Sequence, residues 1–183
     1  MAFNISEIRA QLSQGGARPS FFMANITNPI DTSGDLKLQF MLKATSIPEW
    51  TVGVVPVPYF GRDIKLAGTR KVAPWNVTVI NDNDFLVRNA FERWQNAINS
   101  LEGNINTTGG PNPLNYKSQG IITQYDPNGQ EVRIYQFEGI FPSTIGEIQL
   151  DWSNGDAIEE FAVTFQVDTF RVVGGRTGDA GGV

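Results

Sequence analysis

The sequence contains no histidine and no cysteine, and these two absences exclude several classes of functional site. Ser-His-Asp and Cys-His nucleophilic sites both need an imidazole to carry the proton, so neither can be built from this chain. Zinc, copper, haem and iron–sulfur sites draw on the same two residue types, which leaves only ions with oxygen ligands, such as Ca²⁺ and Mg²⁺. We therefore expect no catalytic, cofactor-binding or metal-binding residues and no enzyme activity.

Long apolar runs and clustered positive charge are also missing. No segment approaches the run of about 18 apolar residues that a membrane helix needs, and the first 16 residues lack the basic start and apolar run of a signal peptide. We therefore expect neither secretion nor membrane insertion. Fourteen Lys and Arg against nineteen Asp and Glu give a net charge of −5, which argues against tight binding of a phosphate backbone. The charge does not exclude a passive contact with a nucleic acid that the protein does not bind tightly.

The length of 183 residues is that of one domain, large enough to bury a core without disulfide or metal support. Nineteen glycines and ten prolines make the chain rich in turns, which favours β structure. The segment 174–183 is small, polar and rich in glycine. We therefore predict a single domain over residues 1–173 and a flexible C-terminal tail over residues 174–183.

A short helix is predicted near the N-terminus. Asn4 and Glu7 form a capping-box pair, and Ile5, Ile8 and Leu12 recur on one helical face before Gly15 ends the run.

The strongest helical pattern covers residues 84–101. Its apolar side chains recur at spacings of four, three, four and three, which places them on one stripe facing a core: Val87, Phe91, Trp94, Ile98 and Leu101. Asp82 or Asp84 can cap the first turn, and Gly103 can end the helix.

Alternating or continuous apolar patterns predict strands elsewhere. They cover 20–27, 36–44, 75–79, 120–125, 131–137 and 161–167, and the segment Asp126-Pro127-Asn128-Gly129 is typical of a hairpin turn. Residues 47–58 are β-branched but contain three prolines, which fits an edge strand or an extended arm and not a central strand. Six to eight strands with two helices indicate a mainly β (α+β) fold, an antiparallel β-sandwich or barrel with one packed flanking helix and a short N-terminal helix.

Several polar motifs have a simpler structural interpretation. Lys117-Ser118 follows a glycine pair, but Tyr116 stands where a phosphate-binding loop needs glycine, which favours an ordinary loop. The Asp126 and Asp151 segments resemble calcium loops without their spacing, and side-chain-stabilised turns explain them better. Asp82 and Asp84 suit helix capping, and the neighbours Glu159 and Glu160 point to opposite faces of a strand.

Two sets of surface side chains are candidates for binding. Four tryptophans could form a sugar-stacking platform, but Trp75 and Trp94 lie in apolar patterns that favour the core, which leaves Trp50 and Trp152 undecided. Four basic residues gather beside Asp63 within ten positions, where they suit a phosphate or a charged protein contact: Arg62, Lys65, Arg70 and Lys71.

Taken in order and spacing, short motifs over residues 18–170 resemble the tail tube proteins of T4-like contractile phages. The matching segments are Arg18-Pro19-Ser20-Phe21-Phe22, Lys43-Ala44-Thr45 with Pro48, Gly61 to Gly68 (GRDIKLAG), Trp75 to Asp82 (WNVTVIND), Phe91-Glu92-Arg93-Trp94 and Leu150-Asp151-Trp152. Two departures are Thr69, where the family often has an acidic residue, and the ending Asp168-Thr169-Phe170, which lacks the usual Tyr or Trp.

The resemblance implies a structural protein of the virion tail, assembled in the host cytoplasm. Its copies would form hexameric rings that stack into a hollow tube, a conduit for DNA ejection. The implied partners are further copies of the chain, the tail sheath protein, the baseplate hub and tail terminator proteins, and, transiently in the lumen, the tape measure protein and DNA.

Three alternatives stay open at this stage. The chain could form the tube of a phage-derived contractile injection particle, it could be a carbohydrate-binding β-sandwich that uses Trp50 or Trp152, or it could be an enzyme with an oxygen-ligated metal.

Two hypotheses concern the assembled tube. The segment 47–71 combines valines with charged residues, as an interface does, and we expect it at a contact between subunits or rings. The wall of the lumen is expected to be acidic, because it must not grip phosphate, and its candidate residues are Glu131, Arg133, Glu160, Gln166 and Asp168.

Overall fold

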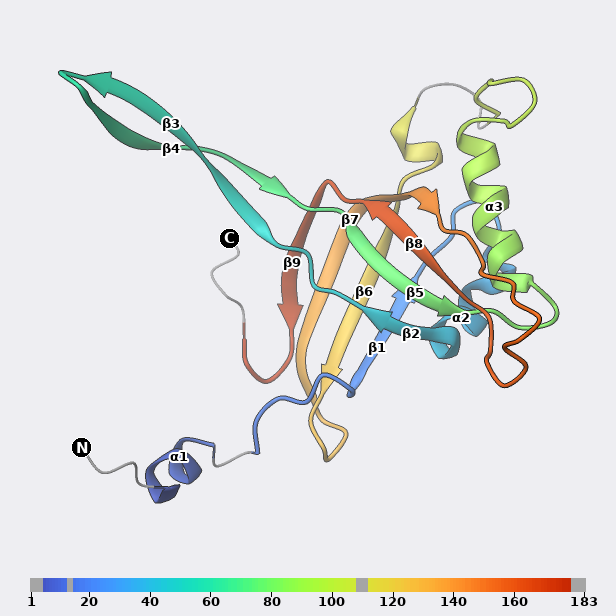
Figure 1. Ribbon diagram of the computed structural model, residues 1–183, viewed down its shortest axis with the longest axis horizontal. Helices are drawn as coiled ribbons and strands as arrows, with labels where there is room; N and C mark the ends of the chain where they lie inside the picture. The colour runs from blue at the N-terminus through green and yellow to red at the C-terminus, as the bar shows by residue number, and fades with distance from the viewer. Residues whose placement is uncertain (1–4, 13–14, 108–111, 179–183) are drawn as a thin grey trace.

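The computed structural model describes residues 5–12, 15–107 and 112–178, and Figure 1 shows the arrangement of its elements. Within these residues the elements follow the order α1 (Ile5–Gln11), β1 (Phe22–Ile26), α2 (Asp35–Met41), β2 (Leu42–Thr45), β3 (Trp50–Tyr59), β4 (Arg62–Val72), β5 (Trp75–Ile80), α3 (Leu86–Ile98), β6 (Ser118–Tyr125), β7 (Glu131–Ile145), β8 (Glu160–Gln166) and β9 (Thr169–Gly174). Short 3₁₀ turns at Thr32–Gly34 and Pro113–Asn115 precede α2 and β6.

Seven strands form one antiparallel sheet in the order β1-β6-β7-β8-β5-β2, and β9 pairs with β7 beside this path. The long strand β7 turns the corner: residues 134–138 pair with β9, whereas residues 141–145 pair with β8. The corner lies at Gly139, which has a φ of +68°, and the carboxylate of Asp168 occupies the space where a side chain at Gly139 would stand. Because the sheet folds at this strand, its two halves face each other across one core.

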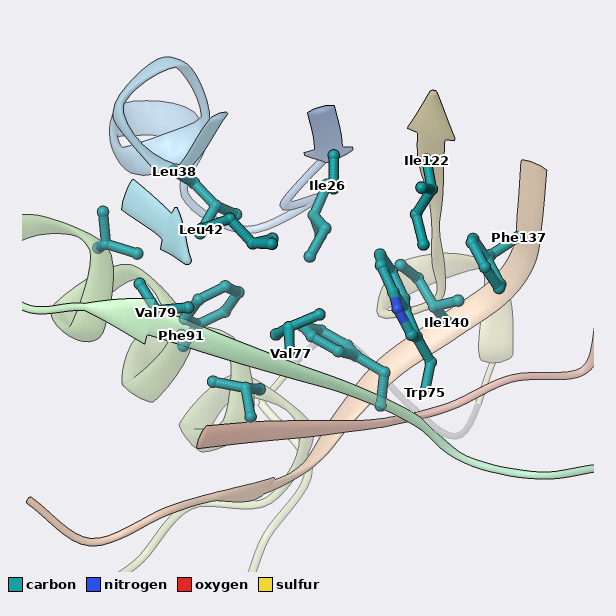
Figure 2. Close-up of a cluster of buried hydrophobic side chains, with 14 of the residues drawn as sticks. Ile26, Leu38, Leu42, Trp75, Val77, Val79, Phe91, Ile122, Phe137 and Ile140 are labelled. Atoms are coloured by element: carbon teal, nitrogen blue, oxygen red, sulfur yellow. The ribbon is translucent and has the colours of Figure 1, made fainter. Parts of the chain in front are cut away.

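The core centres on the indole of Trp75, which is fully buried (Figure 2). Its ring stacks on Phe137 at a centroid distance of 4.4 Å and contacts Phe165 at 5.5 Å. Gly120 lies against the same ring, since a Cβ there would come within 2.7 Å of the indole. The indole N–H donates to the hydroxyl of Thr45 at 2.7 Å, so the one polar atom of this side chain is satisfied.

Helix α3 covers the folded sheet with its apolar stripe, as its spacing predicts. Val87, Ala90, Phe91 and Trp94 are buried, and the rings of Phe91 and Trp94 lie 5.7 and 6.1 Å from Phe165. The indole N–H of Trp94 donates to the carbonyl of Tyr116 at 2.8 Å, which ties the helix to the segment before β6.

The predicted class, mainly antiparallel β with a packed flanking helix, is confirmed. The N-terminal helix, the strands at 20–27, 75–79 and 161–167 and the 120–137 hairpin all form where the patterns place them. Asn4, the expected cap of α1, lies outside the described residues.

The strand predicted over 36–44 is wrong, because residues 35–41 form helix α2 and only 42–45 form a strand. The five alternating apolar residues also satisfy a helical spacing of four. Leu38 and Leu42 are buried, and Leu36 and Phe40 are exposed. Leucine, lysine, glutamine and methionine favour helix, and Asp31 accepts a hydrogen bond from the N–H of Ser33 in the preceding 3₁₀ turn.

Three further details differ from the predictions. The main helix ends at Ile98, five residues before Gly103, so Leu101 leaves the core stripe and is exposed. Strands β4 and β9 were not predicted, and they bring the number of strands in the described residues to nine. The carboxylate of Asp84 accepts from the N–H of Leu86, but the residue at the cap position itself is Phe85, at φ +52°.

The predicted tail begins inside the fold. Gly174 ends β9, the N–H groups of Arg176 and Thr177 donate to the carbonyls of Glu131 and Val132, and Arg176 pairs with Asp126. Residues 179–183 lie outside the described part of the chain, so the flexible tail stays a prediction.

The central position of Trp75 gives a test of this core. Trp75→Ala removes a fully buried ring from a stack that cannot close around the gap, and we expect it to lower the free energy of unfolding by about 3–5 kcal/mol. The control is Trp152→Ala, at a fully exposed indole, which should change the free energy of unfolding by less than about 0.5 kcal/mol. Urea unfolding of soluble protein measures both. Equal losses for the two variants would contradict the assignment of the core.

Candidate assembly surfaces

Strands β3 and β4 form a two-stranded ribbon that projects from the body of the molecule (Figure 1). Their connection is the two-residue turn Phe60-Gly61, with φ values of +45° and +79°. Positive φ at both positions matches the twist of a hairpin, and glycine suits it whereas phenylalanine does not. Phe60 is 92% exposed and packs edge-on against Tyr59. A strained aromatic residue held at an exposed tip suggests a contact site.

The two faces of the ribbon differ in composition. Three cross-strand pairs, Tyr59↔Arg62, Val57↔Ile64 and Val55↔Leu66, lie on one face, which we call the valine face. Its five apolar side chains are between 41% and 63% exposed. The cation Arg62 belongs to the tip pair of this face, and Lys71 lies nearer the base of the ribbon, beyond the register irregularity between Val52 and Val54. The other face carries Val54 and Ala67 with Pro56, Pro58, Asp63 and Lys65.

An aromatic series anchors the base of the ribbon to the core. Trp50 lies 4.6 Å from Phe170, Phe170 lies 5.3 Å from Phe137, and Phe137 stacks on Trp75. The guanidinium of Arg70 also lies over Trp50, 5.0 Å from the ring centroid. The arm is therefore fixed at its root, while its tip projects away from the body (Figure 1).

A second exposed apolar surface is the loop of residues 146–159 between β7 and β8. Leu150, Trp152 and Ile158 are 78%, 106% and 70% exposed. The loop contains four carboxylates and no basic residue: Glu147, Asp151, Asp156 and Glu159. Asn81 fixes its end, because the N–H and side-chain amide of Asn81 donate to the carbonyl and the carboxylate of Glu159. In Figure 1 this loop lies beside α3, at the opposite end of the long axis from the tip of the ribbon.

Smaller apolar surfaces lie on α1 and α2. Helix α1 buries none of its residues, so Ile5 and Ile8 point to solvent together with Leu12. Leu36 and Phe40 form an exposed pair on α2.

The polar motifs of the sequence act as turn and ion-pair residues. Asp126 accepts hydrogen bonds from the N–H groups of Asn128 and Gln130, and Asp151 accepts from the N–H and hydroxyl of Ser153, so both form the side-chain-stabilised turns that the sequence predicts. The ammonium of Lys117 binds the carboxylate of Asp168.

Lys37 on α2 joins the two aspartates before α3. Its ammonium binds the carboxylates of both Asp82 and Asp84. Hydrogen bonds from Lys37 lower the pKa of each aspartate, and the two carboxylates together raise the pKa of Lys37. These aspartates therefore act as ion-pair residues that connect α2 to the start of α3.

The four tryptophans do not converge. Trp75 and Trp94 are in the core, as predicted. Trp50 is half-exposed and committed to Phe170 and Arg70, and Trp152 stands on the distant loop 146–159. A shared sugar-stacking platform is therefore not formed by them.

The expected lumen residues fall in two groups. Gln166, Glu160 and Asp168 lie on or after β8; Glu160 pairs with Lys43 and Asp168 pairs with Lys117. Glu131 begins β7 and is exposed, whereas Arg133 lies over the ring of Tyr135. Two of the three carboxylates are thus paired with a cation within the same chain.

In the described part of the chain, no helix has the length and apolar character needed to cross a bilayer.

Known proteins are similar to this chain in sequence. Tail tube protein gp19 of Enterobacteria phage T4 is 35% identical over 161 residues, covering 87% of this chain and 94% of that protein. The tail tube protein of Serratia phage KSP90 is 28% identical over 178 residues, covering 94% of this chain and 98% of that protein.

Solved structures support the same fold at lower identity. A chain from the baseplate of the anti-feeding prophage has a TM-score of 0.65 at 14% identity, covering 88% of this chain and 97% of that chain. A chain from the sheath–tube complex of the extracellular contractile injection system PVC has a TM-score of 0.57 at 13% identity, covering 94% and 99%. The sequence model of the family described as phage tail tube protein matches residues 1–173. The chain belongs to the phage tail tube protein family.

Proposed function

We propose that this chain is the structural subunit of the inner tube of a contractile phage tail, with six copies in each ring and the rings stacked into a hollow conduit for DNA. The observation that carries the proposal is the match to the tail tube family over residues 1–173, which also supports a single domain of that extent. No catalytic, cofactor or metal site belongs to this role, in keeping with structural relatives.

The ribbon β3–β4 supports repeated self-association. An isolated two-stranded hairpin is marginally stable in water, and this one exposes apolar side chains on its valine face. A contact between this surface and a different surface of the next copy is heterologous, so it closes into a ring or continues along an axis. A tube of stacked rings needs both kinds of contact, one that closes each ring and one that continues from ring to ring along the axis.

The proposed partners follow from the assemblies in which fold relatives occur. Chains of similar fold come from a baseplate, a sheath–tube complex and a tube-terminating cap. We propose that this tube likewise contacts a sheath outside, a baseplate hub at one end and a terminator at the other, and that the tape measure protein and DNA pass through it. Its place is the virion tail, after assembly in the host cytoplasm.

The second candidate is the tube of a phage-derived injection particle, which the fold relatives favour. The identity to phage tail tube proteins, 35% against 13–14% for the injection-system chains, favours the phage tail.

Self-assembly is the first test. Purified full-length protein should form rings or tubes, seen by negative-stain imaging and as fast-sedimenting species in analytical ultracentrifugation. The apolar ribbon should drive this assembly at moderate salt. A monomer at every protein concentration and salt concentration would contradict the proposed function.

The ribbon gives a second prediction. Val54→Asp with Val55→Asp places one carboxylate on each face of β3, and burying either without a partner is strongly unfavourable. The double variant should keep the circular dichroism of the wild type and lose elongation, seen as at least a tenfold drop in sedimenting protein. Val54→Thr with Val55→Thr is the control, which keeps the shape without charge. Full-length tubes from the aspartate variant would exclude the ribbon from the contact.

The sign of the net charge on the lumen wall gives a third prediction. A net charge of −5 per chain gives about −30 for a ring of six, which repels DNA if the surplus faces inward. A cryo-imaging structure of the tube should show a net negative inner wall. Of the three candidate carboxylates, Glu131 is the one without a cation partner among the described residues. A net positive wall would contradict the repulsion argument.

A further inference from the structure

Two surfaces each gather several charges that have no ion-pair partner, and the two clusters have opposite overall sign. Among the described residues, none of the four cations of the ribbon lies within ion-pair distance of a carboxylate: Arg62, Lys65, Arg70 and Lys71. The four carboxylates of loop 146–159 likewise have no cation partner among the residues that the structure describes. Elsewhere on the body, carboxylates such as Glu138, Glu160 and Asp168 are paired. The ribbon carries a net charge of +3 and the loop −4.

Both surfaces also expose apolar side chains that the fold leaves uncovered. The five apolar residues of the valine face span about 13 Å along the strands, given roughly 3.3 Å per residue. That length accommodates one indole with one or two aliphatic side chains beside it. Trp152, with Leu150 two residues away, is the matching set on the loop, and its ring is the most exposed large apolar side chain among the described residues. Tryptophan is one of the residues enriched among the side chains that dominate the binding energy of protein interfaces.

We infer that Trp152 and the acidic loop 146–159 of one copy dock on the valine face of the ribbon β3–β4 of the next copy. This inference rests on the proposed function and names the surfaces of one contact. Arg62 lies at the tip end of the valine face and Lys71 lies farther along the ribbon, near its base, so both are placed to meet the loop carboxylates that flank the indole. The tip of the ribbon and the loop lie at opposite ends of the molecule (Figure 1), so one chain cannot join them itself.

The other exposed apolar surfaces lack this complementarity. Helix α1 carries Glu7 and Arg9, one charge of each sign. On α2, Lys37 is already bound to Asp82 and Asp84. Neither helix carries a surplus of negative charge that would complement the basic ribbon, whereas loop 146–159 does.

Disulfide cross-linking tests the contact directly, because the chain has no cysteine of its own. Two single variants are mixed, assembled and oxidised: Asn154→Cys, on the loop, and Ile64→Cys, on the valine face. Lys65→Cys is the matched control, since residue 65 neighbours residue 64 but points to the opposite face. A disulfide needs Cα atoms within about 7 Å. We expect cross-linked dimers at least tenfold more abundant for the pair 154–64 than for the pair 154–65.

A second experiment asks whether the indole drives assembly. Trp152→Ser should lower the amount of sedimenting protein at least tenfold, while Leu101→Ser, at an equally exposed position outside the contact, should leave it within twofold. Equal loss in both variants, or normal assembly of Trp152→Ser, would overturn the inference.

The outcomes separate the two proposals. Wild-type tubes in which the pair 154–64 cross-links no more than the control overturn the docking of the loop and leave the proposed function standing. A wild-type protein that stays monomeric and gives no cross-link overturns both.

Discussion

The constraint on which the rest of the structure depends is that the ribbon β3–β4 cannot bury its own apolar side chains. Two strands have two faces, and here both carry valine or other apolar residues while no other element of the described chain lies over them. In the free chain the valine face stays in water at a cost in free energy that only a second molecule can remove. Self-association is therefore a consequence of the fold and not an accessory to it.

The body of the protein is arranged to hold this ribbon in one direction. The rings of Trp50, Phe170, Phe137 and Trp75 follow one another from the root of the ribbon to the centre of the core. Because Trp75 and Phe137 are fully buried between the two halves of the sheet, the root cannot tilt without disturbing the packing of the core. A contact surface fixed in this way loses less conformational entropy on association than a free arm.

Much of this fold could be predicted from periodicity, and the failures have physical causes. The stripe on α3 and the alternation on β5 and β8 describe elements with one buried face, for which the pattern is decisive. The apolar residues from Leu36 to Ala44 fit both the alternation of a strand and the spacing of four of a helix. Burial of Leu38 and Leu42 in the tertiary fold favours the helix. Strand β4 has charged residues among its apolar ones because it faces solvent in the free chain, so no core-facing alternation marks it. The prolines of residues 47–58 did indicate an arm outside the central sheet, since proline cannot donate to a sheet ladder.

The candidate surfaces were harder to predict than the fold, because their signal is the absence of an intramolecular partner. The sequence shows the basic cluster of residues 62–71, and it leaves Trp50 and Trp152 undecided between core and surface. It cannot show that Lys43, Lys117 and Arg171 pair with carboxylates of the same chain while the ribbon cations do not. Nor does it show that Trp50 stacks inward whereas Trp152 stands free. Among the charges that stay unpaired in the described residues, two clusters stand out, a basic one on the ribbon and an acidic one on loop 146–159. The tip of the ribbon and the loop lie at opposite ends of the molecule (Figure 1). Segregation of this kind favours head-to-tail contact and disfavours contact between like ends, which would bring four cations against four cations. In the proposed docking, the same distribution selects both the partner and its orientation.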